Sequence, residues 1–172
     1  MRALARFEGY LDAFAVSRRE LLRRAFGPAR QCRVEVAEDI SSGRLCGYSV
    51  VLVTRYTYDL KPALTLKELY VEAQSRRRGL GLALMRGAAA YAVEIGAGRI
   101  KWDVLPGNNG AERFYRSLGG RRVNEWIAYV MDEPSFRELA GSRPKTTEEW
   151  PRGRPRNGPR LGDGRREKGR AR

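Results

Sequence analysis

A chain of 172 residues, 42% of them hydrophobic, is long enough for one packed domain followed by a tail. Its net charge is +14 and it contains no histidine, which excludes metal sites built on histidine and histidine-based nucleophilic catalysis. No hydrophobic run approaches the roughly 18 residues of a transmembrane helix, and the charged N-terminus is unlike a signal peptide, so we expect a cytoplasmic protein without a membrane segment.

In chain order, the first part predicts two helices and a hairpin of two strands. Ser17 and Glu20 have capping-box spacing, in which two side chains satisfy free amide groups at a helix start, and Gly27–Pro28 ends that helix. Alternating hydrophobic and polar residues on either side of the turn Ser41–Gly43 indicate the strands. The expected elements are a helix over residues 3–10, a helix over 17–27, and strands over 32–38 and 47–54.

The middle of the chain predicts a strand, a loop rich in glycine and arginine, and a long helix. The strand covers residues 65–71, and the helix covers residues 80–95 and ends at Gly96. Within the helix, hydrophobic residues recur at three- and four-residue spacing, which predicts one buried face. The members of this stripe are Leu82, Met85, Ala89 and Val93.

The last part predicts a strand, a helix, another strand and a final helical turn. The helix begins at Asn108 or Asn109, and Asn109 with Glu112 also has capping-box spacing. The expected elements are a strand over residues 99–105, a helix over 110–118, a strand over 123–131 and a helical turn over 134–140.

These elements indicate an α/β (α+β) fold. Hairpin strands followed by a strand–helix–strand unit predict a mixed, mostly antiparallel sheet with helices on both faces. We expect one domain over residues 1–141 and a basic tail rich in proline, glycine and arginine over 142–172. Residues 143–172 hold eleven lysines and arginines against four acidic residues. A disordered, solvated tail is the simpler interpretation, and weak contact with nucleic acid is the alternative.

The two cysteines, Cys32 and Cys46, have a spacing that matches no metal or redox motif. Reduced thiols are the simpler interpretation, and a single Cys32–Cys46 disulfide is the alternative. No metal site is expected.

The loop between the strand ending at Val71 and the helix beginning at Leu80 is a candidate phosphate site. Three arginines, Arg76–Arg78, are followed by Gly79 and Gly81. Glycines let the backbone approach a ligand closely, and the free N–H groups of a helix start attract anions, as arginines do. The spacing lacks the third glycine of a dinucleotide fingerprint and the Lys-Ser/Thr of a P-loop. On these residues alone, a solvated arginine loop is an equal alternative.

Two segments, in this order, resemble the motifs of the GNAT superfamily of N-acetyltransferases. Leu69–Gly81 resembles the pyrophosphate motif, in which a strand ending in valine is followed by Arg/Gln-x-x-Gly-x-Gly/Ala and a helix. Asn108–Gly119 is similar to the second signature, Asn-x-x-Ala-x-x-Phe-Tyr-x-x-x-Gly. Through Phe7–Tyr10, Glu125–Trp126 and Tyr129–Asp132, the chain most resembles the diamine branch, the spermidine/spermine and thialysine acetyltransferases.

The resemblance implies a GNAT fold and transfer of acetyl from acetyl-CoA to a primary amine of a small molecule, which is a diamine, a polyamine or an amino-acid-like compound. It also implies a homodimer and a reaction without a metal. Peptide or protein amines are the alternative acceptors, and a catalytically impaired protein that binds acyl-CoA or nucleic acid is the alternative function. The residues implied for acetyl-CoA binding are Leu69, Tyr70, Val71, Arg76, Arg77, Arg78, Gly79, Leu80, Gly81, Leu82, Asn108 and Ala111.

For catalysis, the resemblance implies Tyr115 and Glu68. The matching tyrosine of the family donates a proton to the departing thiolate, and a core tyrosine is the alternative interpretation. The acidic pair of the diamine branch aligns with Lys67 and Glu68, so a lysine replaces the first acid. Because neighbouring side chains of a regular strand point to opposite faces, Glu68 is not expected to take over its place. The base is then a water relayed through Glu68, Glu72 or a backbone carbonyl, or the activity of the branch is lost.

Two departures from the family concern the substrate and the start of the chain. An ammonium group at Lys67 would repel a polyamine. The family also has a strand and the first turns of a helix before the residues that match Arg2–Tyr10. We therefore expect a shortened start and an uncovered edge of the sheet.

Overall fold

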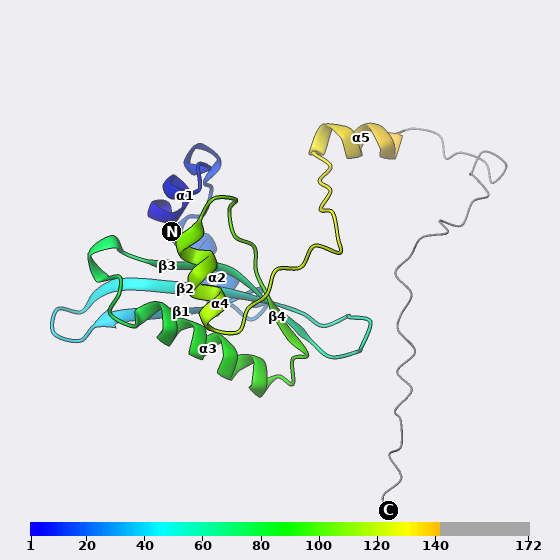
Figure 1. Ribbon diagram of the computed structural model, residues 1–172. Coiled ribbons are helices and arrows are strands. Elements are labelled where there is room, and N and C mark those ends of the chain that lie inside the picture. The colour runs from blue at the N-terminus through cyan, green and yellow to red at the C-terminus, as the bar shows by residue number, and fades with distance from the viewer. Residues whose placement is uncertain (142–172) are drawn as a thin grey trace, which may run out of the picture. The chain divides into compact units, whose positions relative to one another are not determined.

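The computed structural model describes residues 1–141 (Figure 1). By its contacts the chain divides into two units, residues 1–121 and residues from 122 onwards. Residues 142–172, for which the sequence predicts a basic tail and a nucleic-acid contact, lie outside the described residues. The helices and strands of the first unit are α1 (Arg2–Phe7), α2 (Arg18–Phe26), β1 (Arg33–Asp39), β2 (Arg44–Thr54), β3 (Ala63–Val71), α3 (Leu80–Glu94), β4 (Arg99–Lys101) and α4 (Asn109–Ser117), with short 3-10 turns at Leu11–Ala13 and Ala73–Ser75.

The four strands form one sheet in the order β1-β2-β3-β4. β1 and β2 pair antiparallel, as do β2 and β3, whereas β3 and β4 pair parallel. This pairing confirms the predicted α/β fold with a mixed, mostly antiparallel sheet. β4 is shorter than the strand predicted over residues 99–105, because only Arg99–Lys101 pair with β3.

Ser17 begins α2 as its spacing predicts. Its Oγ accepts a hydrogen bond from the Glu20 amide at 3.2 Å, which satisfies one of the free amides of the first turn. The Glu20 carboxylate instead pairs with Arg23 at 2.8 Å and Arg24 at 3.1 Å, one turn further on. The helix start is therefore stabilised by the serine, and the glutamate supports the exposed surface of the helix.

The core lies between α3 and the sheet, but of the predicted α3 stripe only Met85 is buried; Leu82 is partly buried, and Ala89 and Val93 are exposed. Val93 is 82% exposed, because another face of the helix packs on the strands. Hydrophobic residues surround α3 on several sides, so periodicity alone does not select the buried side. The buried α3 residues are Leu84, Met85, Ala88 and Ala92, and the last three pack with Val51, Leu64 and Leu66 of the sheet.

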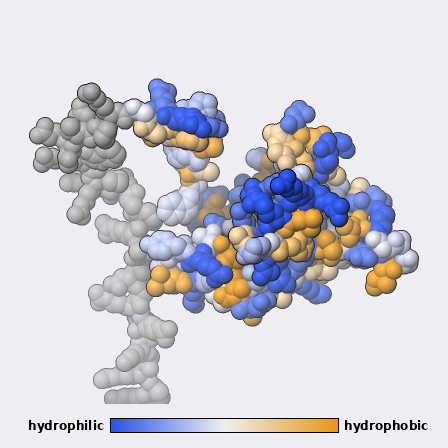
Figure 2. All heavy atoms as spheres, turned by 180° about the vertical axis from the view of Figure 1, so that it is seen from behind, coloured by the Kyte–Doolittle hydropathy of each residue, from blue (hydrophilic) through white to orange (hydrophobic). Residues whose placement is uncertain are grey.

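The sheet has helices on both faces, as predicted. A Cβ atom on Gly47 of β2 would lie 3.5 Å from the Leu84 side chain, so this side of β2 faces α3. Phe114 and Tyr115 of α4 pack against the same core. Because side chains alternate along a strand, the buried Val50 belongs to the other face, where Figure 1 shows α2 behind the strands. Figure 2 shows that side of the molecule, on which hydrophobic surface lies among hydrophilic surface.

The strand predicted over residues 123–131 is not formed. Among the described residues these positions pair with no strand, and the exposed fractions of Trp126 and Tyr129 are 81% and 92%. Alternation and β-forming residues give a segment the capacity to form a strand, but a strand also needs a partner edge. The second unit then continues into α5 (Glu133–Gly141), close to the helical turn predicted over 134–140. No helix within residues 1–141 has the length and hydrophobicity to cross a membrane.

Candidate active site

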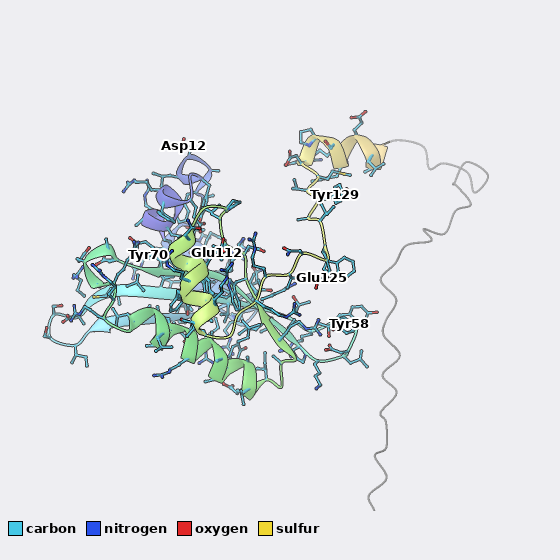
Figure 3. All side chains as sticks on the ribbon, in the orientation of Figure 1. Asp12, Tyr58, Tyr70, Glu112, Glu125 and Tyr129 are labelled. Atoms are coloured by element: carbon cyan, nitrogen blue, oxygen red, sulfur yellow. The ribbon has the colours of Figure 1, made fainter. Side chains whose placement is uncertain are left out.

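A pocket of about 630 Å³ opens where β3 and β4 separate. Their pairing ends at Thr65 and Lys101, and beyond it residues 66–71 line one wall and residues 102–105 the other. Strands that separate leave N–H and C=O groups unpaired along the edges that face each other. An extended ligand with amide groups can pair with this edge of β3 like an added strand. In Figure 3 the labelled Tyr70 and Glu112 mark β3 and α4, which both contribute residues to the pocket.

One end of the pocket is formed by the loop before α3 and by the first turn of this helix. Gly79 precedes α3 with a left-handed φ of 80°, and no side chain caps the amides of the first turn. The helix has 15 residues with no acidic residue in its first turn, so its start carries a partial positive charge. Arg77 lines the pocket, and Arg76 donates from Nε to the Val71 carbonyl at 3.0 Å. These groups together can bind a phosphate.

Ser75, which no sequence pattern singles out, is an independent sign of a ligand at this end. The residue is 1% exposed and belongs to the pocket lining, and its buried Oγ has no hydrogen-bond partner among the described residues. A buried hydroxyl without a partner costs about 1–3 kcal/mol of stability. A ligand oxygen that accepts its hydrogen bond would remove this cost. The periodicity of the sequence does not predict a role for Ser75, because its hydroxyl is buried and left unpaired by tertiary packing.

Most residues predicted to bind acetyl-CoA are brought together in this pocket. Arg78 is not, since it is exposed and lies outside the pocket lining. Glu72, a candidate for the proton relay, also lies outside, because its carboxylate pairs with Arg44 and accepts a hydrogen bond from Gln74 at 2.8 Å. The predicted residues that line the pocket are Glu68, Leu69, Tyr70, Val71, Arg76, Arg77, Gly79, Leu80, Gly81, Leu82, Asn108, Ala111 and Tyr115.

The expectation that Lys67 and Glu68 point to opposite faces assumes regular alternation, and β3 does not alternate regularly at this point. Both residues line the pocket, as does every residue over 66–71. The pairing of β3 with β2 passes from Leu66 directly to Glu68, which leaves Lys67 as the extra residue of a β-bulge. Leu66 and Leu69 consequently pack against the same α3 core although they are three residues apart. A bulge interrupts regular alternation and redirects side chains. Regular alternation therefore does not separate the lysine from the glutamate, and the charges of both act on Glu8.

The Glu68 carboxylate is held by Tyr48 of β2. The Tyr48 phenol donates a hydrogen bond of 2.7 Å to Glu68 Oε2. Burial raises the pKa of Tyr48 strongly, and so do this hydrogen bond and the negative charge of Glu68, so the phenol remains a donor at neutral pH. The Tyr48 ring lies 6.0 Å from the Tyr70 ring, centroid to centroid, beside the pocket wall.

Glu8, at the end of α1, brings a second carboxylate to the pocket. Burial raises the pKa of Glu8, as does the charge of Glu68, whereas the charge of Lys67 lowers it. These effects require that the three charged groups lie within electrostatic reach of one another. From sequence, Glu8 is marked only as part of the segment that resembles the diamine branch.

Tyr115 of α4 lines the middle of the pocket. Its ring packs on Trp102 at 4.9 Å and on Phe114 at 5.2 Å between ring centroids. Burial, with a smaller contribution from the charge of Glu8, raises the pKa of Tyr115 to about 12. The phenol keeps its proton at neutral pH and can donate it to a group in the pocket.

Asn108 begins α4 and lines the pocket as well. Its Oδ1 accepts a hydrogen bond of 3.2 Å from the Ala111 amide. The cap is therefore Asn108, and the alternative capping pair of Asn109 and Glu112 is wrong: the Glu112 carboxylate accepts a hydrogen bond from Arg116 at 3.0 Å. The side chain thus has a structural role beside any contact with a ligand.

The described residues contain no group of three or more acidic or cysteine side chains arranged to hold a metal ion. Cys32 and Cys46 are both free thiols, so the alternative disulfide is not formed. Cys32 lies close to Glu68, and burial together with that negative charge raises the pKa of its thiol.

Comparison with known proteins agrees with this geometry. The sequence model of the Acetyltransferase (GNAT) family matches residues 5–119. Thialysine N-epsilon-acetyltransferase of Bos taurus is 28% identical over 149 residues, which cover 82% of this chain and 88% of the bovine protein. L-ornithine N5-acetyltransferase NATA1 of Arabidopsis thaliana is 32% identical over 66 residues, 38% of this chain and 29% of the plant protein. The solved structure of the V. cholerae integron cassette protein VCH_CASS6 has a TM-score of 0.66 at 24% identity and covers 81% of this chain and 86% of its own.

Proposed function

The chain belongs to the acetyltransferase (GNAT) family, and on that premise we propose that it transfers acetyl from acetyl-CoA to a primary amine of a small molecule. One observation carries this proposal: a single pocket joins an anion-binding end, the unpaired edge of β3 and the buried phenol of Tyr115. The similar proteins of cattle and Arabidopsis are named for acetylating amines of thialysine and L-ornithine.

The residues present fit acetyl-CoA. Its diphosphate suits the start of α3, where free amides, Arg77 and the unpaired Ser75 hydroxyl lie together. The amide groups of its pantetheine arm suit the edge of β3 over residues 69–71, which β4 does not pair. When bound, acetyl-CoA supplies the thioester carbonyl carbon that accepts the amine.

Side chains of this protein take part in two proton transfers. The acceptor enters as an ammonium ion, which the carboxylates of Glu8 and Glu68 attract. Glu68, held by Tyr48, accepts one proton through a water, and the freed amine nitrogen bonds to the carbonyl carbon. The carbon–sulfur bond breaks, Tyr115 donates its proton to the sulfur, and the phenolate recovers a proton from the acylated amine. The products are the amide and the free thiol of CoA.

Binding of acyl-CoA without turnover is the second candidate, and Lys67 is the observation that favours it. The lysine stands where the diamine branch has an acid, so the residue that would take the proton from a diamine is replaced. A homodimer remains a prediction from the resemblance, and a cytoplasmic location remains a prediction from the composition and the N-terminus.

The test is a screen of primary amines with acetyl-CoA, in which release of the CoA thiol is measured together with binding of CoA. Thiol release with a small amine supports the proposed function. CoA binding, seen as a rise in the melting temperature, without thiol release from any amine would support the second candidate instead.

A further inference from the structure

The amine end of the pocket carries charges of both signs. Glu8 at the end of α1 and Glu68 on β3 contribute two carboxylates, and Lys67 contributes an ammonium group next to them. A pocket for a diamine would need negative charge alone. The mixture of signs suits a molecule that is itself of mixed charge.

The bulge in β3 is what places Lys67 in this position. As the residue that the β2 pairing skips, it is released from the regular alternation of the strand, and it lines the pocket as Glu68 does. Among residues 1–141 no ion pair or hydrogen bond holds its ammonium group. Its charge reaches Glu8, whose pKa it lowers, yet it stays exposed enough to meet a ligand. The ammonium group is thus available to an anion that enters the pocket.

We propose that Lys67 selects an acceptor that carries a carboxylate besides the reacting amine, namely an amino acid with a side-chain amine, over the diamine of the same chain length. This inference rests on the proposed function. Lys67 attracts the carboxylate and repels the second ammonium group of a diamine, while Glu8 and Glu68 attract the ammonium group that reacts. Lys67 is then a specificity-determining residue and takes no part in proton transfer.

Two pairs of probes isolate the carboxylate. Ornithine and putrescine differ by this group alone, as do lysine and cadaverine. For each pair, kcat/KM with acetyl-CoA and the Kd with CoA-saturated protein are measured. We expect the wild type to favour the amino acid, and Lys67→Met to reduce this preference about tenfold, as expected for loss of one charge-assisted hydrogen bond. Lys67→Glu should invert the preference and Lys67→Arg should retain it.

Lys101→Met is the matched control, because Lys101 is an exposed lysine on the neighbouring strand that does not line the pocket. It should leave both preferences unchanged. Equal binding of amino acid and diamine by the wild type, or a preference that Lys67→Met and Lys67→Glu leave unchanged, would overturn the inference. Binding that depends on the carboxylate but gives no thiol release would support the inference about Lys67 and count against the proposed acetyl transfer. The two proposals can therefore fail separately.

Discussion

The phenol of Tyr48 donates a 2.7 Å hydrogen bond to the carboxylate of Glu68. The two residues lie on neighbouring strands, β2 and β3, and the carboxylate lines the pocket beside a β-bulge. Tyr48 therefore fixes the orientation of Glu68, the acidic side chain that lines the pocket beside the bulge. Its role is one of positioning, since the phenol itself is not among the pocket-lining groups.

Tyr48→Phe removes this hydrogen bond and keeps the ring. We expect kcat/KM for an amine to fall about tenfold, because a carboxylate without its fixed donor samples unproductive orientations. The Kd of CoA should change much less, since Tyr48 does not line the pocket. Tyr56→Phe is the control, because Tyr56 is an exposed tyrosine in the β2–β3 loop. A loss of CoA affinity equal to the loss of activity would show that Tyr48 acts on the whole fold instead.

Tyr115→Phe tests the proton donor. Turnover should fall about 100- to 10,000-fold, the range for loss of a general acid, while CoA binding measured by titration persists. Tyr91→Phe serves as the control, because Tyr91 is a partly buried tyrosine of α3 that stacks on Arg33 and does not line the pocket. Unchanged turnover in Tyr115→Phe would leave Tyr115 as a core residue only.

The raised pKa of Tyr115, about 12, predicts a titration that can be seen directly. The tyrosinate absorbance of the wild type minus that of Tyr115→Phe should rise near pH 12 and not near pH 10. Between the two values the unfolded chain releases a proton that the folded protein retains, so the free energy of unfolding should decrease as pH rises from 10 toward 12, and Tyr115→Phe should lack this contribution. A difference spectrum that rises near pH 10 would mean that burial does not control this phenol.

Ser75→Ala should have opposite effects on stability and on binding. Removal of a buried hydroxyl without a partner leaves the free energy of unfolding of the free protein unchanged or raises it, as measured in urea. The Kd of CoA should rise about five- to tenfold if the hydroxyl donates to the cofactor. Binding of 3′-phospho-ADP should weaken as much as that of CoA, and binding of pantetheine should not.

Ser49→Ala is the control for Ser75→Ala. Ser49 is equally buried, at 1% exposed, but lies outside the pocket. Its substitution should leave the Kd of CoA unchanged. If both variants weaken CoA binding alike, Ser75 acts through packing and does not contact the cofactor.

Local sequence signals predicted much of this fold because they act over a few residues. The Ser17 cap, the hairpin of β1 and β2 and the glycine-bounded α3 all form near their expected bounds. The anion-binding end is local as well, since Gly79 and the free amides of the first α3 turn are contiguous in the chain. Such features depend on backbone dihedral angles and on nearby hydrogen bonds, which neighbouring residues determine.

The errors concern features that depend on distant partners. The strand expected over residues 123–131 has no partner edge among the described residues. Arg78 lies outside the pocket although it adjoins Arg77, which lines it. The buried face of α3 was missed because hydrophobic residues surround the helix, and only contact with β2 and β3 selects Ala88 and Ala92.

The hydrogen bond between Tyr48 and Glu68 shows the difference between features that local sequence predicts and features that depend on distant partners. The motifs show an acidic residue ahead of the loop rich in glycine and arginine, with a lysine before that acid. The direction of these side chains depends on tertiary contacts, because it follows from how β3 pairs with β2. One skipped residue in that pairing interrupts the alternation between Lys67 and Glu68, and Glu68 meets Tyr48 of the neighbouring strand.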